Sequence, residues 1–166
     1  MRLPDEVLDG LVAWQRELVD PRVRHVPRDN LHVTLAFLGS RPAEEQDAIG
    51  AALREAAATG TRPVFEVGGY RETRSVGMLT LADEDGRAGA LAEDLFERLE
   101  RLGVYRREQR RWLAHVTVVR FRERPRLRPG VPELPPFSPS DAAVYLSRLR
   151  PTGAQYVVLE SFGLGG

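Results

Sequence analysis

The sequence predicts an α+β protein in which two pseudo-symmetric lobes surround a central cleft, with residues 1–166 forming a single bilobal domain. The main observation is a motif, His-x-Thr-x with apolar x, that occurs twice, at residues 32–35 and 115–118. Each copy lies in an apolar run, 31–38 or 113–121, whose length and β-branched residues are typical of buried strands. The copies are 83 residues apart, half the chain, and each lies near a helical pattern. This repetition indicates an internal duplication.

Prolines, glycines and capping residues mark where the expected helices begin and end. Pro4, followed by two acids, begins the first helix and Pro21 ends it. Ser40 and Pro42 begin the second helix, and Gly103 ends the third. The expected elements are, in order, a helix from residues 4–6 to about 18, an extended piece 23–26, a turn 27–30, the first motif strand 31–38, a helix from 42 to about 58, strands 64–67 and 76–81, a helix 91–102, the second motif strand 113–121, a proline-rich loop 125–139, and strands 142–149 and 156–164 around a turn at 151–153.

In each motif strand the histidine and the threonine share one face. Residues two apart along a strand point to the same side, so each copy presents an imidazole and a hydroxyl together. These pairs are His32 with Thr34 and His115 with Thr117. Two of the three histidines thus occupy the same position of a repeated motif, which favours a functional role, and both pairs are expected to line a common cleft. We interpret the third histidine, His25, as a partly exposed strand residue.

The composition excludes several classes of protein. The chain has no cysteine, which excludes disulfides, thiol nucleophiles and cysteine metal ligands. No apolar run approaches the roughly 20 residues that span a bilayer, and the N-terminus lacks the basic start and apolar stretch of a signal peptide. We therefore expect a cytoplasmic protein that does not bind membranes.

The surroundings of the two motifs resemble one known superfamily, the 2H phosphoesterases. Residues 30–39, NLHVTLAFLG, and 114–120, AHVTVVR, are similar to those of the bacterial and archaeal RNA 2′,3′-cyclic phosphodiesterases, the LigT-like branch. Residues 145–149 and 153–156 resemble the closing strand pair of that branch. The likeness therefore covers nearly all of the chain.

The resemblance implies both a fold and an activity. Each lobe would be an antiparallel sheet with helices on its outer face. The protein would be a monomer, without a cofactor, that acts in RNA processing by hydrolysing 2′,3′-cyclic phosphate ends of RNA or nucleotides to 2′-phosphomonoesters. His32 and His115 would be catalytic, and Thr34 and Thr117 would bind the substrate phosphate. The resemblance also favours His32 as the acid that protonates the leaving oxygen and His115 as the base that activates water.

The likeness departs from the family pattern in two places. Relatives usually begin with a strand of the form Arg-x-Phe-x-Ala, and here only residues 1–4, MRLP, stand in its place, so one sheet edge is expected to lack its neighbour. Ala114 stands where many relatives have proline. Neither departure touches a motif residue.

The chemistry of the residues agrees with this activity. With an unperturbed pKa of about 6.5, one neutral and one protonated imidazole can act as base and acid near pH 7. The hydroxyls of Thr34 and Thr117 can donate hydrogen bonds to the phosphate oxygens, where charge accumulates. A zinc site needs at least three protein ligands, commonly with carboxylate or thiolate help, and neither motif strand carries Asp, Glu or Cys on the histidine face. We therefore expect no metal.

Basic residues are concentrated around the second motif. All 24 are arginine, and residues 98–128 hold eleven of them against three acids, although the net charge of the chain is zero. An anionic ligand is therefore expected there. Arg120 could bind phosphate, but strict alternation places it on the face opposite to Thr117, and a solvated charge is the alternative. The arginines expected to contact an RNA backbone, with a solvated face as the alternative, are Arg106, Arg107, Arg110 and Arg111.

Two other functions remain open from the sequence. One is a non-catalytic module that binds RNA ends or nucleotides, and the other is a phosphodiesterase for another cyclic or 2′,5′-linked nucleotide. The presence of both histidines favours an enzyme, because simple binding does not need two proton carriers.

Overall fold

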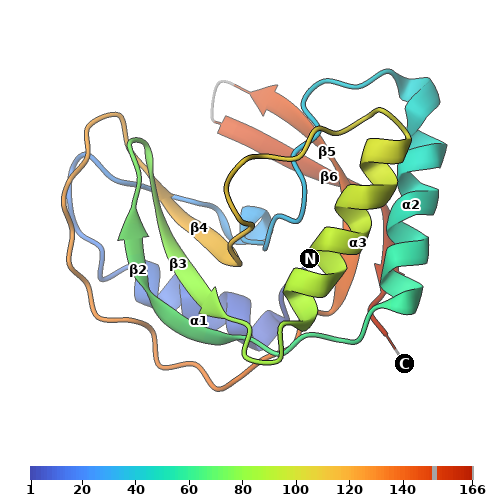
Figure 1. Cartoon of the computed structure of the whole chain (residues 1–166). Coiled ribbons are helices and arrows are strands. Elements are labelled where there is room, and N and C mark those ends of the chain that lie inside the picture. Colours follow the sequence, from blue (N-terminus) through green and yellow to red (C-terminus); the bar gives the residue numbers. More distant parts are fainter. Residues whose placement is uncertain (151–152, 166) are drawn as a thin grey trace.

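The computed structural model of the protein describes residues 1–150 and 153–165 and has the predicted α+β fold of two lobes (Figure 1). One lobe contains a four-stranded antiparallel sheet in the order β1-β4-β3-β2, and the other contains the antiparallel pair β5-β6. The expected turn residues Pro151 and Thr152 lie outside the described residues. The elements are α1 (Asp5–Gln15), β1 (Arg24–His25), the 3₁₀ helices η1 (Arg28–Asn30) and η2 (Ala43–Glu45), α2 (Gln46–Thr59), β2 (Glu66–Glu72), β3 (Val76–Ala82), α3 (Arg87–Arg101), β4 (His115–Arg120), β5 (Asp141–Arg150) and β6 (Gly153–Gly163).

Isolated bridges connect the two sheets through the first motif. Val33 bridges Val116 of β4 in antiparallel orientation. Arg2 bridges His32 on one side and Asp141 of β5 on the other, and its N–H donates to the Asp141 carbonyl oxygen at 3.0 Å. The N-terminal segment is therefore paired on both sides, and the sheet edge expected to lack its neighbour is occupied.

The helices lie on the outer sides of the sheets. α1 packs against β4 and buries Val7 and Leu11. α2 packs on β5 and β6, and α3 lies against α2 (Figure 1). The leucine stripe predicted for α3 is buried at Leu91, Leu95 and Leu99. Because α3 joins β3 to β4 yet packs in the other lobe, neither lobe is a contiguous half of the chain. Within the described ranges, no helix combines the length and apolar character that crossing a bilayer requires.

Two predicted strands differ from the structure. The first motif forms bridges only at His32 and Val33, and Phe37 beyond them is 79% exposed. The residues before β4 are irregular, so the chain beyond Thr34 has no strand to pair with. The strand predicted at 64–67 instead runs from Glu66 to Glu72, because a bulge between Val67 and Gly69 lets the pairing with β3 continue past Gly68 and Gly69.

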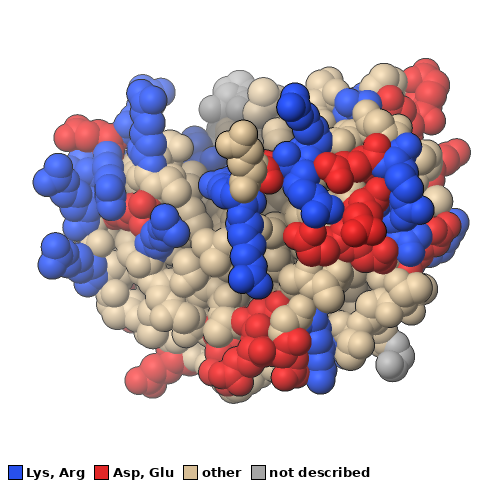
Figure 2. Space-filling view, viewed as in Figure 1, with Lys and Arg blue, Asp and Glu red and all other residues tan. Residues whose placement is uncertain are grey.

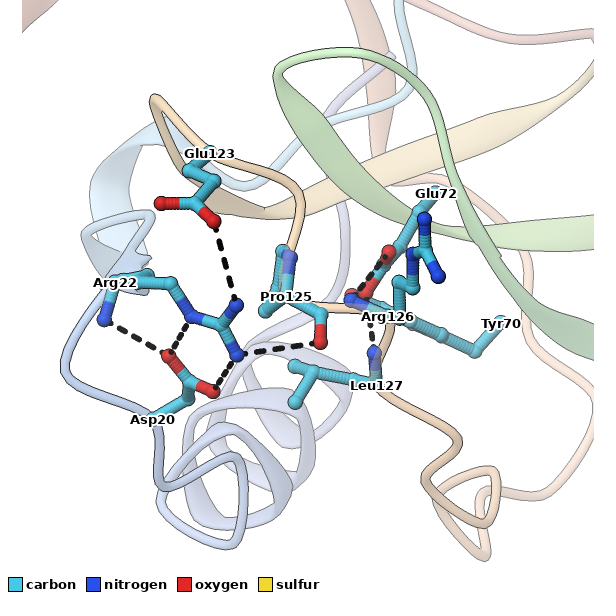
Figure 3. Close-up of polar contacts among 8 residues, drawn as sticks. All are labelled: Asp20, Arg22, Tyr70, Glu72, Glu123, Pro125, Arg126 and Leu127. Carbon is cyan, nitrogen blue, oxygen red and sulfur yellow. Dashed lines mark hydrogen bonds and ion pairs between the residues drawn. The ribbon is translucent and has the colours of Figure 1, made fainter.

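A buried carboxylate anchors the proline-rich loop after β4 (Figure 3). The side chain of Glu72, at the end of β2, is 2% exposed. It accepts hydrogen bonds from the backbone N–H groups of Leu127 at 2.7 Å and Arg126 at 3.0 Å. Arg22 contacts the same loop from the other side, where its Nη2 donates to the carbonyl oxygen of Pro125 at 3.3 Å. The loop therefore keeps a defined course with little regular structure, as predicted.

Replacing Glu72 by alanine is expected to lower the free energy of unfolding by about 3 kcal/mol, because it leaves loop N–H groups without an acceptor at a buried site. It also removes the partner of Arg124, whose Nε lies 3.0 Å from Glu72 Oε2. Denaturant unfolding measures this loss. The matched control is Glu45→Ala, which removes only the partly exposed pair with Arg41 and is expected to cost less than about 1 kcal/mol. Equal losses in the two variants would contradict the proposed anchor.

Candidate active site

The bridge between Val33 and Val116 brings the two motifs side by side. Both valines point into the core, where they are 0% and 1% exposed. Their neighbours within each motif, the histidine and the threonine, therefore point to the opposite side of the sheet. The repeated pattern of the sequence thus becomes one cluster of four polar side chains.

Antiparallel pairing determines how the four side chains lie. Because Val33 is opposite Val116, His32 is opposite Thr117 and Thr34 is opposite His115. The two histidines thus occupy one diagonal of the cluster and the two threonines the other. Diagonal neighbours on paired strands are about 7–8 Å apart, which leaves room for a small tetrahedral group between the imidazoles.

The two imidazoles are oriented by the same kind of hydrogen bond. Nδ1 of His32 lies 2.8 Å from the carbonyl oxygen of Asn30, and Nδ1 of His115 lies 2.8 Å from that of Leu113. Because a carbonyl oxygen only accepts, Nδ1 carries the proton in both rings. Nε2 is therefore the nitrogen of each ring that can exchange a proton with a ligand.

His32 is enclosed by two tyrosines of the β5-β6 pair. Its ring centroid lies 5.3 Å from that of Tyr145 and 5.1 Å from that of Tyr156. Desolvation lowers the pKa of His32 to about 4, and the N-terminal amino group of Met1, when it is protonated, acts in the same direction. His32 is therefore neutral at pH 7, and the hydroxyl of Thr34, 3.1 Å from Nε2, can donate to it.

A cleft opens on this face of the molecule. His115 is half-buried and is not among the residues that line this cleft. It lies close enough to His32 to contribute to lowering the pKa of His32. Nε1 of Trp112 donates to the Thr34 carbonyl oxygen at 3.1 Å and holds the approach to the second motif against the first. Within residues 1–150 and 153–165, no three His, Asp or Glu side chains are grouped so that they could hold a metal ion. The cleft is lined by Arg24, His25, Val26, Pro27, Asn30, His32, Thr34, Thr117, Arg120, Gly153, Ala154 and Tyr156.

Arg120 lines the cleft, contrary to the strict alternation that places it on the other face. Consecutive residues of β3 pair with Thr117 and Val119, which leaves Val118 as an extra residue in β4. Val118 and Val119 are both fully buried, so this β-bulge returns Arg120 to the face of Thr117. A Cβ at Gly77, which pairs with Val119, would lie 2.6 Å from Val119 Cγ2, so glycine is needed opposite the bulge.

Several residues that line the cleft were not singled out as site residues from the sequence, among them the polar residues Arg24, Asn30 and Tyr156. Nδ2 of Asn30 donates to a backbone carbonyl of β6 at 2.7 Å and ties the start of the first motif to the other lobe. The sequence predicted that Arg24 lies in an extended piece at 23–26, but it did not predict that this piece pairs with β4, and that pairing places Arg24 at the cleft. His25 is an exposed strand residue that borders the cleft, with Nε2 3.3 Å from the carbonyl oxygen of Leu18.

The four arginines before the second motif do not line the cleft. Arg107 forms ion pairs with Glu93 at 2.7 Å and Glu100 at 3.6 Å, and Arg110 pairs with Glu108 at 2.6 Å. Figure 2 shows arginines and acids intermixed over α2 and α3, whereas arginines predominate over the lobe of β2 and β3. Contacts of Arg106, Arg107, Arg110 and Arg111 with an RNA backbone stay a prediction.

Comparisons with known proteins agree with this architecture. The family model described as LigT like Phosphoesterase matches residues 2–75, which include the first motif. The crystal structure of TT0787 of Thermus thermophilus is 28% identical in sequence, with a TM-score of 0.85 over 98% of this chain and 93% of that chain. E. coli LigT in apo form is 22% identical, with a TM-score of 0.82 over 100% of this chain and 95% of that chain. A search of curated protein sequences found no significant match.

E. coli LigT has also been crystallised with ligands. Its structures include complexes with 3′-AMP and with NADP+, which match this chain with TM-scores of 0.85 and 0.81 at 21% and 24% identity. Each covers 100% of this chain and 95% of that chain. At this level of identity the likeness shows a common fold.

Proposed function

This chain belongs to the LigT-like branch of the 2H phosphoesterase superfamily, and on that premise we propose that it hydrolyses 2′,3′-cyclic phosphate ends of RNA or nucleotides to 2′-phosphomonoesters. The observation that carries the proposal is the diagonal placement of His32 and His115 across the bridge between the motifs. A phosphate lying between them has an imidazole on either side, as displacement in line with the leaving oxygen requires. No metal or cofactor takes part in this proposal.

His32 acts as the base and His115 as the acid. Because burial lowers the pKa of His32 to about 4, its Nε2 is free to take a proton from water as the water oxygen attacks phosphorus. The bond between phosphorus and the ribose O3′ breaks, and His115 gives its Nε2 proton to O3′, which leaves the phosphate on O2′. This assignment is the reverse of the one that the resemblance favours. The reason is that the tyrosines around His32 disfavour its charged form.

The two threonines bind the oxygens on which charge accumulates. Thr34 and Thr117 both line the cleft and lie on the diagonal that crosses the line between the imidazoles. Their hydroxyls can therefore donate to the two non-bridging oxygens without blocking attack or departure. In this structure the Thr34 hydroxyl can donate to Nε2 of His32, and a phosphate oxygen bound between the motifs takes the place of that acceptor.

The ligands of the relative support a substrate of this class. In 3′-AMP the phosphate is on the ribose 3′ oxygen, and NADP+ carries a phosphate on a ribose 2′ oxygen. These are the two oxygens that a 2′,3′-cyclic phosphate joins. That E. coli LigT is seen with both compounds supports a cleft that accepts ribose phosphates at either position.

Incubating the purified protein with nucleoside 2′,3′-cyclic phosphates and identifying the product isomer by phosphorus NMR tests the proposal. We expect the 2′-phosphate, with 3′,5′-cyclic AMP left intact as a control. Tight binding without turnover would instead indicate a binding module. Cleavage of 2′,5′-linked dinucleotides alone would indicate the other phosphodiesterase activity.

A further inference from the structure

Six arginines gather at the end of the β2-β3 lobe, outside the cleft. They come from two segments, the end of β2 with the turn after it and the loop that follows β4. The two segments are adjacent, because the N–H of Phe121 donates to the carbonyl oxygen of Ser75 at 3.0 Å and Glu72 accepts from the backbone of the loop. Arginines predominate over this lobe in Figure 2. We call these exposed residues the arginine surface: Arg71, Arg74, Arg122, Arg124, Arg126 and Arg128.

The acids of the two segments do not neutralise the arginine surface. Residues 71–74 and 122–128 contain six arginines and only two acids, Glu72 and Glu123. Glu72 is buried, and its carboxylate is occupied by Arg124 and the loop backbone. Glu123 is 81% exposed and lies 4.0 Å from an arginine before β1. The guanidiniums of the other five arginines take part in no ion pair or hydrogen bond within residues 1–150 and 153–165.

Other exposed arginines of the molecule have close acidic partners. Arg41 pairs with Glu45 at 2.6 Å. Arg107 pairs with Glu93 at 2.7 Å. Because the net charge of the whole chain is zero, the excess of positive charge is a property of one region of the surface. A region with one sign of charge attracts a ligand of the opposite sign.

Strand register places the arginine surface beside the second motif. Arg71 of β2 is opposite Met78 of β3, and Met78 is opposite Thr117 of β4. Directly opposite residues of antiparallel strands point to the same side, so Arg71 and Thr117 share one face of the sheet. They are two strand spacings apart, which is about 10 Å. A chain with its end at Thr117 can therefore cross this face toward Arg71 and the turn that carries Arg74.

The loop after β4 holds one of its arginines in an unfavourable backbone conformation. Arg126 has a φ of 60°, in the left-handed region that glycine and asparagine adopt more readily. Glu72 stabilises this conformation by accepting hydrogen bonds from the N–H groups of Arg126 and Leu127. Backbone strain of this kind is concentrated at functional sites. An arginine at this position therefore favours a role for its exposed side chain.

The ligand that fits such a surface is a chain of phosphates. A 2′,3′-cyclic phosphate occupies both ribose oxygens of the last nucleotide, so the rest of an RNA is attached on its 5′ side. A protein that binds this end in a cleft leaves the remaining nucleotides outside the cleft, each with one phosphate. Guanidiniums form charge-assisted hydrogen bonds with phosphate, and the counterions that are released add to the affinity.

We propose that the arginine surface binds the phosphate backbone of the RNA whose 2′,3′-cyclic end lies between the histidines. This inference rests on the proposed function and narrows its substrate from nucleotides in general to RNA ends. The backbone contacts are thereby assigned to the β2-β3 lobe. Of the arginines before the second motif, Arg107 and Arg110 are already paired with acids.

The first test compares octauridylate ending in a 2′,3′-cyclic phosphate with uridine 2′,3′-cyclic phosphate. For the wild type we expect kcat/KM at low salt to be about 10-fold or more higher for the oligonucleotide, because only that substrate reaches the arginine surface. Combining Arg71→Gln, Arg74→Gln, Arg122→Gln and Arg128→Gln should reduce this ratio toward one. The same four arginines changed to lysine should keep most of it, because the charges remain. The matched control is Arg54→Gln, an exposed arginine of α2 in the other lobe, which should keep the wild-type ratio.

Binding gives a second readout that does not need turnover. The probe is octauridylate ending in a 2′-phosphate, the expected product, titrated at increasing salt. The logarithm of the association constant should fall with the logarithm of the salt concentration by about 0.7 for each phosphate contacted in a single strand. Four contacts give a slope of about −3 for the wild type, and the fourfold glutamine variant should lose most of that slope.

A wild-type ratio near one would overturn the inference, as would equal losses on both substrates or an unchanged salt slope in the fourfold glutamine variant. Loss of the slope in an Arg106→Gln, Arg111→Gln variant instead would place the RNA before the second motif. Equally tight binding of an octaglutamate peptide would overturn the inference in favour of an acidic protein partner. If neither cyclic phosphate is hydrolysed, the proposed function fails, and the salt slopes still decide whether the arginine surface binds RNA.

Discussion

Replacing either His32 or His115 by alanine is expected to lower kcat/KM for a 2′,3′-cyclic phosphate by about 10²- to 10⁴-fold, the usual contribution of a positioned acid or base. The double variant should lose far less than the product of the two single losses, because the imidazoles act on one phosphate as a unit. The wild type should show a bell-shaped dependence of kcat/KM on pH, whose two limbs belong to the pair. Steady-state kinetics of the three variants measure these effects.

The control for this experiment is His25→Ala, which removes the third histidine. Its Nε2 contacts the Leu18 carbonyl oxygen at 3.3 Å, so most of the activity should remain. Chelators should leave the wild-type rate unchanged. Loss of activity on chelation, with recovery on adding zinc or manganese, would show instead that the histidines are metal ligands.

A substrate whose leaving group needs no proton is expected to rescue His115→Ala and not His32→Ala. If His115 is the acid, an activated phosphodiester such as bis(p-nitrophenyl) phosphate avoids the step that it catalyses. The loss caused by His115→Ala should then shrink by about 10²-fold or more relative to the cyclic phosphate. The loss caused by His32→Ala should persist, because water must still be deprotonated. The opposite pattern of rescue would restore the assignment that the family resemblance favours.

The pH dependence of the His115→Ala variant gives an independent measure of the same roles. A base works only when neutral, so the residual activity of this variant should rise with pH through the pKa of His32, which burial holds below its usual range, and then level off. If His32 were the acid, residual activity would fall through the same range. The pH profile of the wild-type enzyme does not distinguish the two assignments of acid and base. Both assignments need one histidine protonated and the other neutral, so both give the same bell shape.

Local patterns predicted most of the elements correctly. Pro4 and the acids after it begin α1, and the leucine stripe of α3 is buried. The wrong strand assignments have a common cause, since the apolar run of the first motif extends past the point where a partner strand is available. β2 likewise continues through a bulge at two glycines, where the low strand propensity of glycine predicts that the strand ends. In both places pairing with a neighbouring strand, which is not a local property, decided the outcome.

The sequence by itself determined which side chains form the candidate site. His32, Thr34, His115 and Thr117 follow from a repeated motif and the two-residue period of a strand. Only the tertiary structure decided how these four side chains lie relative to one another. The bridge between Val33 and Val116 depends on register between segments 83 residues apart, and the β4 bulge that turns Arg120 depends on the pairing with β3. The low pKa of His32 likewise arises from burial beside Tyr145 of β5 and Tyr156 of β6. Hydrophobic periodicity and strand propensity are local properties of the sequence, so they do not predict this pKa.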